Sequence, residues 1–382
     1  MKIIKLLGLV LIIISASCTQ RKEHSDNEIK NLAFKNATAE ENPTLDYELT
    51  FIKLETSESC LINRINQIEY KKDTLFLLDF VTSKLLAFNK QGAFLQAIGK
   101  KGNGPGEFVI PLSISLSKDK TKLYIVDAGQ EKLIEYDSHT FEFLTEKKLK
   151  FDTSCGYPLN EKCWIWNDQG YQNKEKDYHF LTTNSNFDIE NHYIEKEFKS
   201  GYISGPSVSI YASNNKMYGY VPFSPVIYEL SENEAVPAFR VEYENIEFPS
   251  SSYMNEISQN GSSSYFDKLS KSGYVSYNMI LGANHHLLAC YIVDNVKYIG
   301  FYNLQNDESH AYKLKDFAKL LKCGKFDYVS SSIESTHFVL PLSPNSLKKM
   351  EAKGYVFCDK LKEILLQTTE EDNPILCVID MK

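Results

Sequence analysis

The residue types that most often perform catalysis are scattered along this 382-residue chain. His285 and His286 form its one adjacent pair of histidines. Neighbouring side chains on an extended segment point to opposite faces, so these two imidazoles would not readily share a metal ion. We expect both in a solvated turn. No Gly-x-Ser-x-Gly pattern places a serine nucleophile, and we identify neither a catalytic constellation nor a metal site.

A glycine-rich segment, residues 98–108, has the composition of a phosphate-binding loop but lacks its pattern. Its glycines are Gly99, Gly102, Gly104 and Gly106. Pro105 interrupts the series and strand-like sequence follows it, whereas a phosphate-binding loop opens a helix. We interpret the segment as a connection between two sheets in which glycine supplies positive φ, and we expect no cofactor.

Two aspartates recur at matching positions. Asp79 and Asp127 each end a strand-like run, Leu-Phe-Leu-Leu-Asp and Leu-Tyr-Ile-Val-Asp. Catalysis would need one unit to differ from the others. Repetition therefore favours a structural role, in which each carboxylate accepts hydrogen bonds from nearby backbone N–H groups.

Five tyrosines in the middle of the chain are candidates for ligand binding: Tyr202, Tyr211, Tyr220, Tyr253 and Tyr265. They lie in or near predicted inter-strand segments and could form a surface on which a sugar or peptide stacks. The alternative is that they pack between sheets, as most tyrosines do in a β-rich chain.

The cysteines do not predict a disulfide framework. Seven remain besides Cys18, an odd number that cannot pair completely, and no Cys-x-x-Cys motif occurs. Several lie in apolar strand-like runs, such as the one around Cys163. We expect buried free thiols that pack as small hydrophobic side chains, and no zinc site.

The N-terminus is typical of an export signal. A positive region with Lys2 and Lys5 precedes an apolar run over residues 6–14, too short for a stable membrane-spanning helix. Small residues 15–17 then lead to Cys18. This resembles the lipobox of bacterial lipoproteins, although Leu is commoner at the position of Ser15. The resemblance implies cleavage before Cys18 and acylation of its thiol, which makes Cys18 the lipid anchor. The alternative is an ordinary secretory signal with an incidental cysteine.

Composition predicts a soluble globular protein. Hydrophobic residues make up 43% and charged residues 24% of the chain, and the 24 Tyr and 22 Phe favour β structure. The net charge is −8, and loss of Lys2 and Lys5 with residues 1–17 makes it −10. An acidic surface repels phosphate backbones, so we expect no nucleic-acid partner. Residues 18–44 are polar without a strand or helix period, which predicts a flexible tether.

An internal repeat predicts the architecture. Residues 75–79 and 84–89 recur as residues 123–127 and 132–137, each offset by 48 residues without a gap. Six apolar strands of this kind begin near Leu75, Leu123, Cys163, Met217, Leu287 and His337. Each follows a polar turn, and second hairpins fit between them. Six units of two hairpins each predict an all-β fold, a six-bladed β-propeller of four-stranded blades.

The long interval before Leu287 contains the polar stretch 250–273, which we interpret as an inserted loop. The last unit is incomplete: a partly helical segment over 345–367 precedes one strand, residues 374–379. Residues 45–54 form a strand with no blade of its own. Pairing these two strands would close the ring and remove an open edge. We therefore expect a signal peptide over 1–17, the tether over 18–44 and one propeller over 45–382.

The repeat and its flanks resemble the six-bladed β-propeller lipoproteins of Bacteroidetes, relatives of NHL-repeat proteins. The resemblance rests on four segments: Phe51-Ile-Lys-Leu-Glu-Thr56, the strand ending at Asp79, Ile98-Gly-Lys-Lys-Gly-Asn-Gly-Pro-Gly-Glu-Phe108, and Asp372-Asn-Pro-Ile-Leu376. It covers about residues 45–382. It implies the fold and an envelope location but no particular activity.

The function we expect is that of a membrane-anchored, non-catalytic binding propeller that recognises a protein partner or a glycan. The alternative is a lyase or hydrolase centred on the channel of the ring, assisted by a divalent metal, which would need carboxylates and histidines from several blades to converge there. We expect contact with the membrane only through the lipid on Cys18, at the outer membrane. Arg21 and Lys22 follow Cys18 where an acidic export tag would mark surface display, which favours the periplasmic face.

Overall fold

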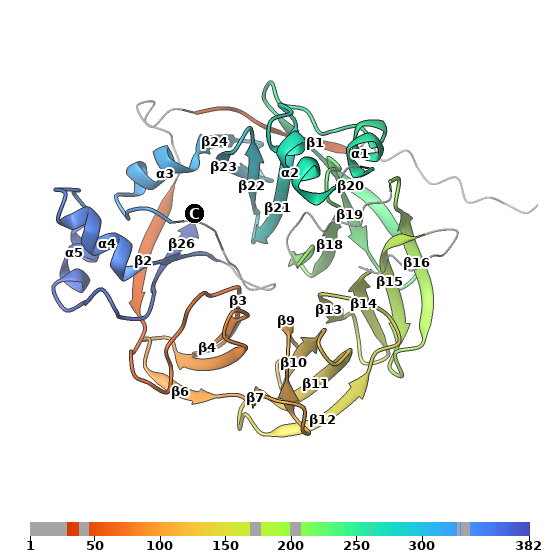
Figure 1. Ribbon diagram of the computed structural model, residues 1–382, viewed down its shortest axis with the longest axis horizontal. Coiled ribbons are helices and arrows are strands. Elements are labelled where there is room, and N and C mark those ends of the chain that lie inside the picture. The colour runs from red at the N-terminus through yellow and green to blue at the C-terminus, as the bar shows by residue number, and fades with distance from the viewer. Residues whose placement is uncertain are drawn as a thin grey trace, which may run out of the picture.

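The computed structural model describes residues 29–37, 46–168, 177–198, 208–259, 261–326, 329 and 337–382. Among these residues, six sheets of three to five strands are arranged in a ring, and a seventh, two-stranded sheet accompanies them (Figure 1). The all-β fold and the six-bladed β-propeller predicted from the repeat are confirmed.

Blades 1 to 3 are four-stranded and antiparallel, with the first strand of each nearest the centre of the ring (Figure 1). Blade 1 contains β3 (Gln67–Lys71), β4 (Thr74–Asp79), β5 (Lys84–Asn89) and β6 (Phe94–Ala97). Blade 2 contains β9 (Pro111–Leu116), β10 (Lys122–Asp127), β11 (Lys132–Asp137) and β12 (Phe143–Lys148). Blade 3 contains β13 (Gly156–Pro158), β14 (Cys163–Asn167), β15 (Tyr178–Asn184) and β16 (Ile189–Glu195).

Blades 4 to 6 continue the ring, and two of them include strands from the N-terminal part of the chain. Blade 4 contains β17 (Ile210–Ser213), β18 (Lys216–Tyr220), β19 (Val226–Leu230), β20 (Ala235–Tyr243) and β1 (Lys30–Phe34). Blade 5 contains β21 (Val275–Ala283), β22 (His286–Val293), β23 (Val296–Asn303) and β24 (Ser309–Lys313). Blade 6 contains β25 (His337–Leu342), β26 (Ile375–Met381) and β2 (Tyr47–Lys53).

The second strand of a blade is apolar because neighbouring blades cover both of its faces. In β4 all residues after Thr74 are buried, and β10 repeats the pattern after Lys122. The outermost strand β12 is almost wholly exposed and correspondingly polar. A strand buried on both faces appears in the sequence as a continuous apolar run, which made these strands recognisable.

The ring closes through both ends of the chain, as predicted. Strand β2 pairs antiparallel with β26 along its whole length, from Tyr47 opposite Met381 to Lys53 opposite Ile375. Asn373 reinforces this junction, because its side chain accepts a hydrogen bond from the Ile62 amide at 2.8 Å and donates to the Glu55 and Cys60 carbonyls. The closure thus joins residues more than 300 positions apart.

The prediction of a tether over 18–44 is wrong for residues 30–34. They form β1, which pairs in parallel with β20 as a fifth, outer strand of blade 4. Leu32 and Phe34 are buried there, and the Phe34 ring lies 5.5 Å from Tyr243 and 5.7 Å from Tyr302. Two buried apolar side chains at alternate positions are enough to fix this short strand against blades 4 and 5.

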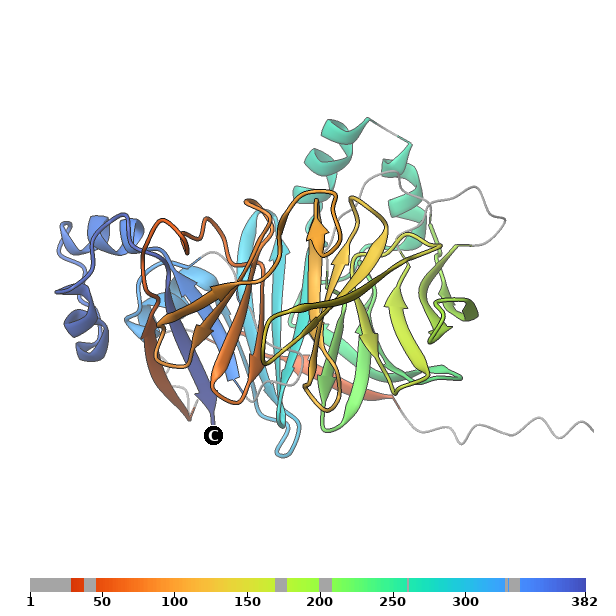
Figure 2. The same ribbon diagram turned by 90° about the horizontal axis from the view of Figure 1, so that it is seen from below.

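The chain reaches β1 from one particular face of the ring. Lys30 Nζ pairs with Asp307 at 2.5 Å and donates to the Leu304 carbonyl at 3.2 Å, both in the turn between β23 and β24. Because successive strands of blade 5 alternate in direction, that turn lies at the opposite end of the blade from the segment preceding β21. Figure 2 shows β1 low on the ring and the helices before β21 above it.

The predicted loop over 250–273 is instead a helical hairpin, α1 (Ser251–Ser258) and α2 (Ser262–Ser270). Ser250 caps α1 by accepting a hydrogen bond from the Tyr253 amide at 3.2 Å. The apolar side of the hairpin buries Met254, Ile257, Tyr265 and Leu269. We call the side of the ring that carries α1 and α2 the insertion face (Figure 2).

Three further helices lie at the rim, of which the first packs on β23 and β24 of blade 5 and the other two lie next to blade 6. They are α3 (Leu314–Leu321), α4 (Pro344–Glu351) and α5 (Asp359–Leu365). The last two occupy the segment predicted to be partly helical. None of the helices in the described ranges is long and apolar enough to cross a membrane.

The recurrent aspartates have the structural role predicted for them. Asp79 accepts hydrogen bonds from the amides of Asn63 at 2.6 Å and Thr82 at 3.2 Å. Asp127 accepts from the amides of Val109 at 3.1 Å and Ile110 at 2.8 Å. Each carboxylate therefore fixes the loop that leads into the innermost strand of its blade.

Candidate functional site

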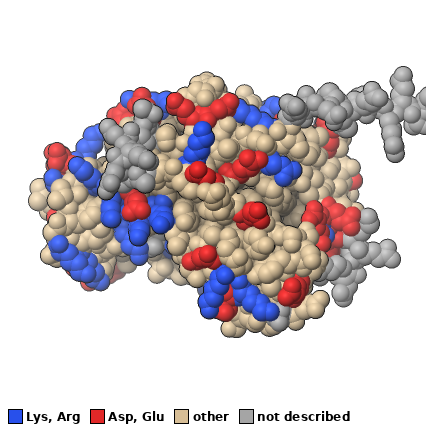
Figure 3. Space-filling view, turned by 90° about the horizontal axis from the view of Figure 1, so that it is seen from above, with Lys and Arg blue, Asp and Glu red and all other residues tan. Residues whose placement is uncertain are grey.

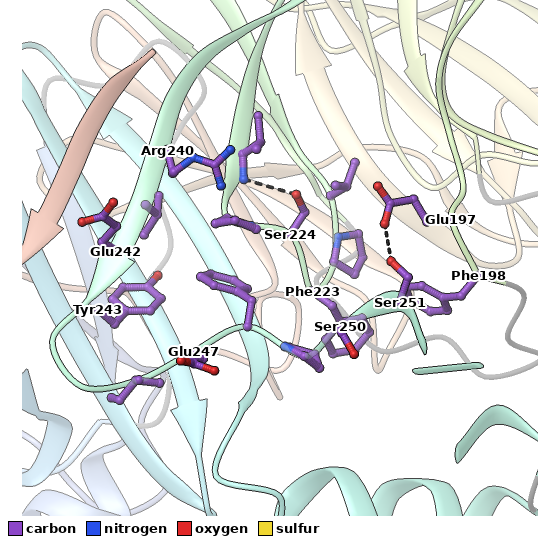
Figure 4. Close-up of a pocket in the computed structure, with 18 of the residues that line it drawn as sticks. Glu197, Phe198, Phe223, Ser224, Arg240, Glu242, Tyr243, Glu247, Ser250 and Ser251 are labelled. Atoms are coloured by element: carbon purple, nitrogen blue, oxygen red, sulfur yellow. Dashed lines mark hydrogen bonds between the residues drawn. The ribbon is translucent and has the colours of Figure 1, made fainter. Parts of the chain in front are cut away.

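A pocket of about 1220 Å³ opens beside the helical hairpin, between blades 3 and 4. Its walls come from β15 and β16 of blade 3 and the residues 197–198 after them, from β19 and β20 of blade 4, and from the segments 221–225 and 245–251. Ser272 and Gly273, just after α2, complete the lining. The pocket therefore lies on the insertion face, and Figure 4 shows the side chains that line it.

Aromatic side chains supply the apolar part of the pocket. The rings of Phe198 and Phe223 lie 6.0 Å apart, and Phe223 also packs against the buried side of α1 and α2. Phe248 stacks on Tyr243 at 5.7 Å, and both line the pocket. The helical hairpin thus packs on the same aromatic cluster that forms one wall of the pocket.

The charged lining is predominantly acidic. Its carboxylates are Glu195, Glu197, Glu242 and Glu247, and its one basic side chain among the described residues, apart from histidine, is Arg240. The Ser251 hydroxyl donates a hydrogen bond to Glu197 Oε2 at one side of the pocket (Figure 4). Basic side chains are blue in Figure 3 and occur at its left, towards α4 and α5, and at its lower edge, where α2 carries Lys268 and is followed by Lys271.

Tyr228 lies between charges of opposite sign. Burial raises the pKa of its hydroxyl, the nearby Glu197 carboxylate raises it further, and Arg240 opposes this rise. The hydroxyl is therefore protonated at any physiological pH and available as a hydrogen-bond donor.

His179 on β15 is the histidine of the pocket lining. Burial lowers its pKa to about 3, and the positive charge of Lys196 acts in the same direction. Lys196 is itself held near His179 by a hydrogen bond of 3.0 Å from its Nζ to the Asp168 carbonyl. His179 is thus neutral at physiological pH. Its side chain forms no hydrogen bond with another described residue, so no carboxylate orients it as a general base.

The predicted tyrosine surface is not assembled. Tyr211, Tyr220 and Tyr265 are 3%, 2% and 0% exposed, so their rings have no free face on which a ligand could stack. Tyr220 donates to the Val208 carbonyl at 2.8 Å, and Tyr211 stacks on Tyr218. For these three side chains the alternative, packing within the sheets and the hairpin, is correct.

Of the remaining predicted site residues, Tyr253 is partly exposed on α1, where its hydroxyl donates to the Lys268 carbonyl at 3.3 Å. Its ring packs against Tyr274 and it does not line the pocket. Cys18 and Tyr202 lie outside the described residues.

The histidine pair is only partly as expected. His285 is an exposed turn residue, but His286 begins β22 and is 7% exposed, with its pKa lowered by burial and by the neighbouring His285. The prediction of two solvated side chains is therefore wrong for His286, because the turn consists only of Asn284 and His285 and β22 begins at His286.

The seven described cysteines are all free thiols. Five of them are buried: Cys60, Cys155, Cys163, Cys323 and Cys377. This confirms the expected role as small hydrophobic side chains.

In the glycine-rich segment, the side chain of Glu107 occupies the space beside the glycine backbone. The ends of the segment, β7 (Lys100–Lys101) and β8 (Glu107–Phe108), pair in parallel between blades 1 and 2. The Glu107 carboxylate accepts a hydrogen bond from the Gly104 amide at 2.8 Å and pairs with Lys100. Gly99 and Gly106 adopt positive φ, which confirms the interpretation as an inter-blade connection.

The alternative of a channel-centred enzyme requires ionisable groups to converge near the innermost strands. There the buried Gln67 donates to Glu69 at 3.1 Å and to the Ile114 carbonyl at 2.7 Å. Within the described ranges, no group of three or more His, Cys, Asp or Glu side chains could hold a metal ion.

Sequence reasoning missed the side chains that form the pocket, among them Phe198, Phe223, Tyr228 and Arg240. One signal was present: the chain contains only three arginines, and Arg240 is the one that falls within an apolar strand. A lone cation in a strand that packs between blades needs either a partner or a cavity.

Comparison with known proteins agrees with this architecture. Residues 19–341 match the family DUF5128, described as a 6-bladed beta-propeller. The crystal structure of a candidate exported protein from Bacteroides fragilis is similar to this chain, with 37% sequence identity and a TM-score of 0.88. That alignment covers 92% of this chain and 100% of the other.

A member of the DUF4221 family from Bacteroides vulgatus shares the fold at 9% identity, with a TM-score of 0.53 over 89% of this chain and 99% of the other. No curated protein matches the chain.

Proposed function

The chain belongs to the DUF5128 family of six-bladed β-propellers, and we propose that it is a lipid-anchored, non-catalytic binding protein of the cell envelope. The observation that carries this proposal is the pocket on the insertion face. It combines a packed aromatic wall with charged side chains of both signs, and it has no oriented nucleophile or general base among the described residues.

Export is supported by the N-terminal pattern that ends at Cys18 and by similarity to a protein whose name describes it as a candidate for export. We propose that the mature chain is acylated on Cys18 and lies at the outer membrane, with the periplasmic face favoured. Eleven residues separate Cys18 from Lys30. Fully extended they span at most about 40 Å.

The short connection between Cys18 and Lys30 restricts how the ring is oriented relative to the membrane. Because Lys30 is fixed to the turn between β23 and β24, the polypeptide from the lipid reaches the ring on the side opposite to the insertion face. The pocket and the helical hairpin would then face away from the membrane, accessible to a partner.

A protein partner fits the site better than a glycan. The pocket is larger than the common range of small-molecule sites, about 300–1,000 Å³. Next to it the hairpin exposes Phe266, which is 45% exposed on α2. An exposed aromatic ring beside a charged, open pocket is typical of protein interfaces, in which aromatic residues are enriched.

The test is capture of partners from the native envelope with the full-length protein, followed by mass spectrometry. The comparison uses wild type, Phe266→Ser and Leu366→Ser. Both replaced side chains are exposed, and Leu366 lies at the far rim beside α5, 84% exposed. We expect Phe266→Ser to lose the partner and Leu366→Ser to keep it.

Two outcomes would contradict the proposal. Equal capture by Phe266→Ser and wild type would remove the hairpin as the recognition element. Absence of any protein partner, together with binding of the wild type to a glycan array, would assign the site to carbohydrate. Cys18→Ala should prevent acylation, which incorporation of a labelled fatty acid measures; equal labelling of wild type and Cys18→Ala would refute the lipid anchor.

A further inference from the structure

Arg240 is a charged side chain that has no counter-ion among the residues the structure describes. It lies on β20, paired in register with Val226 of β19, and is partly buried in the pocket lining. Its guanidinium forms no hydrogen bond or ion pair with any described residue. A guanidinium has five N–H donors, and a partly desolvated one is costly unless an acceptor satisfies them.

The nearby carboxylates do not provide that acceptor. Glu197 is engaged by the Ser251 hydroxyl. Glu242 follows Arg240 by two residues on the same strand, yet its carboxylate and the guanidinium point in opposite directions in Figure 4. The arrangement leaves the guanidinium fork directed into the cavity.

The side chains around Arg240 restrict the chemical class of ligand that the pocket can bind. A planar guanidinium binds a carboxylate or a phosphate through two parallel hydrogen bonds. The protonated Tyr228 hydroxyl beside it can donate a further bond to the same anion. Among the described residues, however, four glutamates and one arginine line the same pocket, which gives this lining a net negative charge. A dianionic phosphate would be repelled, whereas one carboxylate accompanied by positive charge would be tolerated.

We propose that Arg240 anchors a single carboxylate of a peptide segment from the partner, and that the surrounding glutamates hold basic side chains next to that carboxylate. This rests on the proposed function, because it names the ligand chemistry of the same pocket. Tyr228 is a second ligand of the carboxylate, and the wall of Phe198 and Phe223 accepts an apolar side chain of the segment.

Nuclear magnetic resonance of the arginine side chains tests this directly in the full-length chain. Only Arg21, Arg64 and Arg240 occur in the sequence, so arginine-selective ¹⁵N labelling gives three Nε–Hε signals. Arg240→Gln assigns one of them by its loss. The probe is the dipeptide N-acetyl-Lys-Phe with a free carboxylate, and its C-terminal amide is the matched control.

We expect the Arg240 signal to shift with the free acid at millimolar concentration while the Arg64 signal stays in place. The amide should bind at least about tenfold more weakly, the effect of losing one charge-assisted hydrogen-bonded group. Arg240→Gln should abolish binding without lowering Tm, since the side chain has no described partner to lose.

Three results would overturn the inference: equal binding of acid and amide, no shift of the Arg240 signal at millimolar acid, or tighter binding of inorganic phosphate than of the acid. Capture of partners from the native envelope with the Arg240→Gln protein distinguishes failure of this inference from failure of the proposed function. Partner capture that survives Arg240→Gln but not Phe266→Ser would refute the carboxylate anchor and leave the binding function in place.

Discussion

The side chain of Gln67 forms a reciprocal hydrogen-bond pair with the backbone of Ile114. Gln67 Nε2 donates to the Ile114 carbonyl at 2.7 Å, and the Ile114 amide donates to Gln67 Oε1 at 2.9 Å. The pair joins the innermost strands of blades 1 and 2 and is buried, with Gln67 5% exposed. The side-chain amide of Gln67 thus forms with Ile114 the two hydrogen bonds that a paired strand would form, at the contact between blades 1 and 2.

Gln67→Leu should therefore destabilise the propeller although it preserves volume. The buried amide and carbonyl of Ile114 would lose their partner, which costs about 2–4 kcal/mol of unfolding free energy. Urea denaturation of wild type, Gln67→Leu and the exposed control Gln96→Leu measures this. A Gln67→Leu protein as stable as the Gln96→Leu protein would show that the pair contributes nothing.

Asp127→Ala should cost about 3 kcal/mol or more, because the carboxylate satisfies the amides of Val109 and Ile110 and a third at Gly129. Thermal unfolding measures the loss, with the exposed Asp46→Ala as the matched control. A fall in Tm no larger than that of Asp46→Ala would contradict the structural role of the recurrent aspartates.

Phe34→Ala tests the strand β1 in the segment that the sequence predicted to be a tether. The ring is 1% exposed and packs over Gly300 between Tyr243 and Tyr302. Its removal should cost about 3–5 kcal/mol, whereas Ile29→Ala, at the exposed start of the segment, should cost little. Equal stability of the two variants would mean that β1 is not part of the folded propeller in solution.

His179 should make the protein less stable in acid. Its pKa is about 3 in the folded state and near 6.5 when unfolded, so between these values the unfolded state binds the extra proton. Stability from this group is complete above pH 6.5 and falls by up to about 1.4 kcal/mol for each pH unit below it.

The measurement is urea unfolding at pH 7.5 and pH 5 for wild type, His179→Phe and the exposed control His139→Phe. His179→Phe should lose less stability between the two pH values than the other two proteins. An identical pH dependence of all three would exclude His179 as the source.

Cys358 should be the first described cysteine to react with iodoacetamide in the native protein. Cys358 and Cys290 are the two that are partly exposed, but burial raises the pKa of Cys290 to about 12, which suppresses its thiolate. Peptide mapping after brief alkylation identifies the site. Cys358→Ser should remove the early label and Cys290→Ser should leave it; early labelling of Cys377 would instead report opening of blade 6.

The sequence by itself determined the propeller, because its evidence is local and repeated. Strands such as β4 and β10 are buried on both faces, so each is a continuous apolar run, and polar turns separate them at similar intervals. Pairing between the strands near Tyr47 and Ile375 could be predicted, since a ring with an open edge would leave backbone groups without hydrogen-bond partners. Asp79 and Asp127 occupy equivalent positions of the repeat, and this recurrence alone predicted that both carboxylates have a structural role.

Only the tertiary structure decided the parts that depend on distant partners. Strand β1 exists because the edge of β20, some 200 residues away, offers backbone partners and a cavity for Phe34; its own five residues are too few to establish a period. The helices α1 and α2 form because Phe223 and Phe198 cover their apolar side. The pocket draws Glu197, Arg240 and Ser251 from separate segments, and whether a tyrosine is a ligand surface or core depends on what packs over its ring. Burial and proximity are properties of the whole fold, and for that reason no local pattern revealed them.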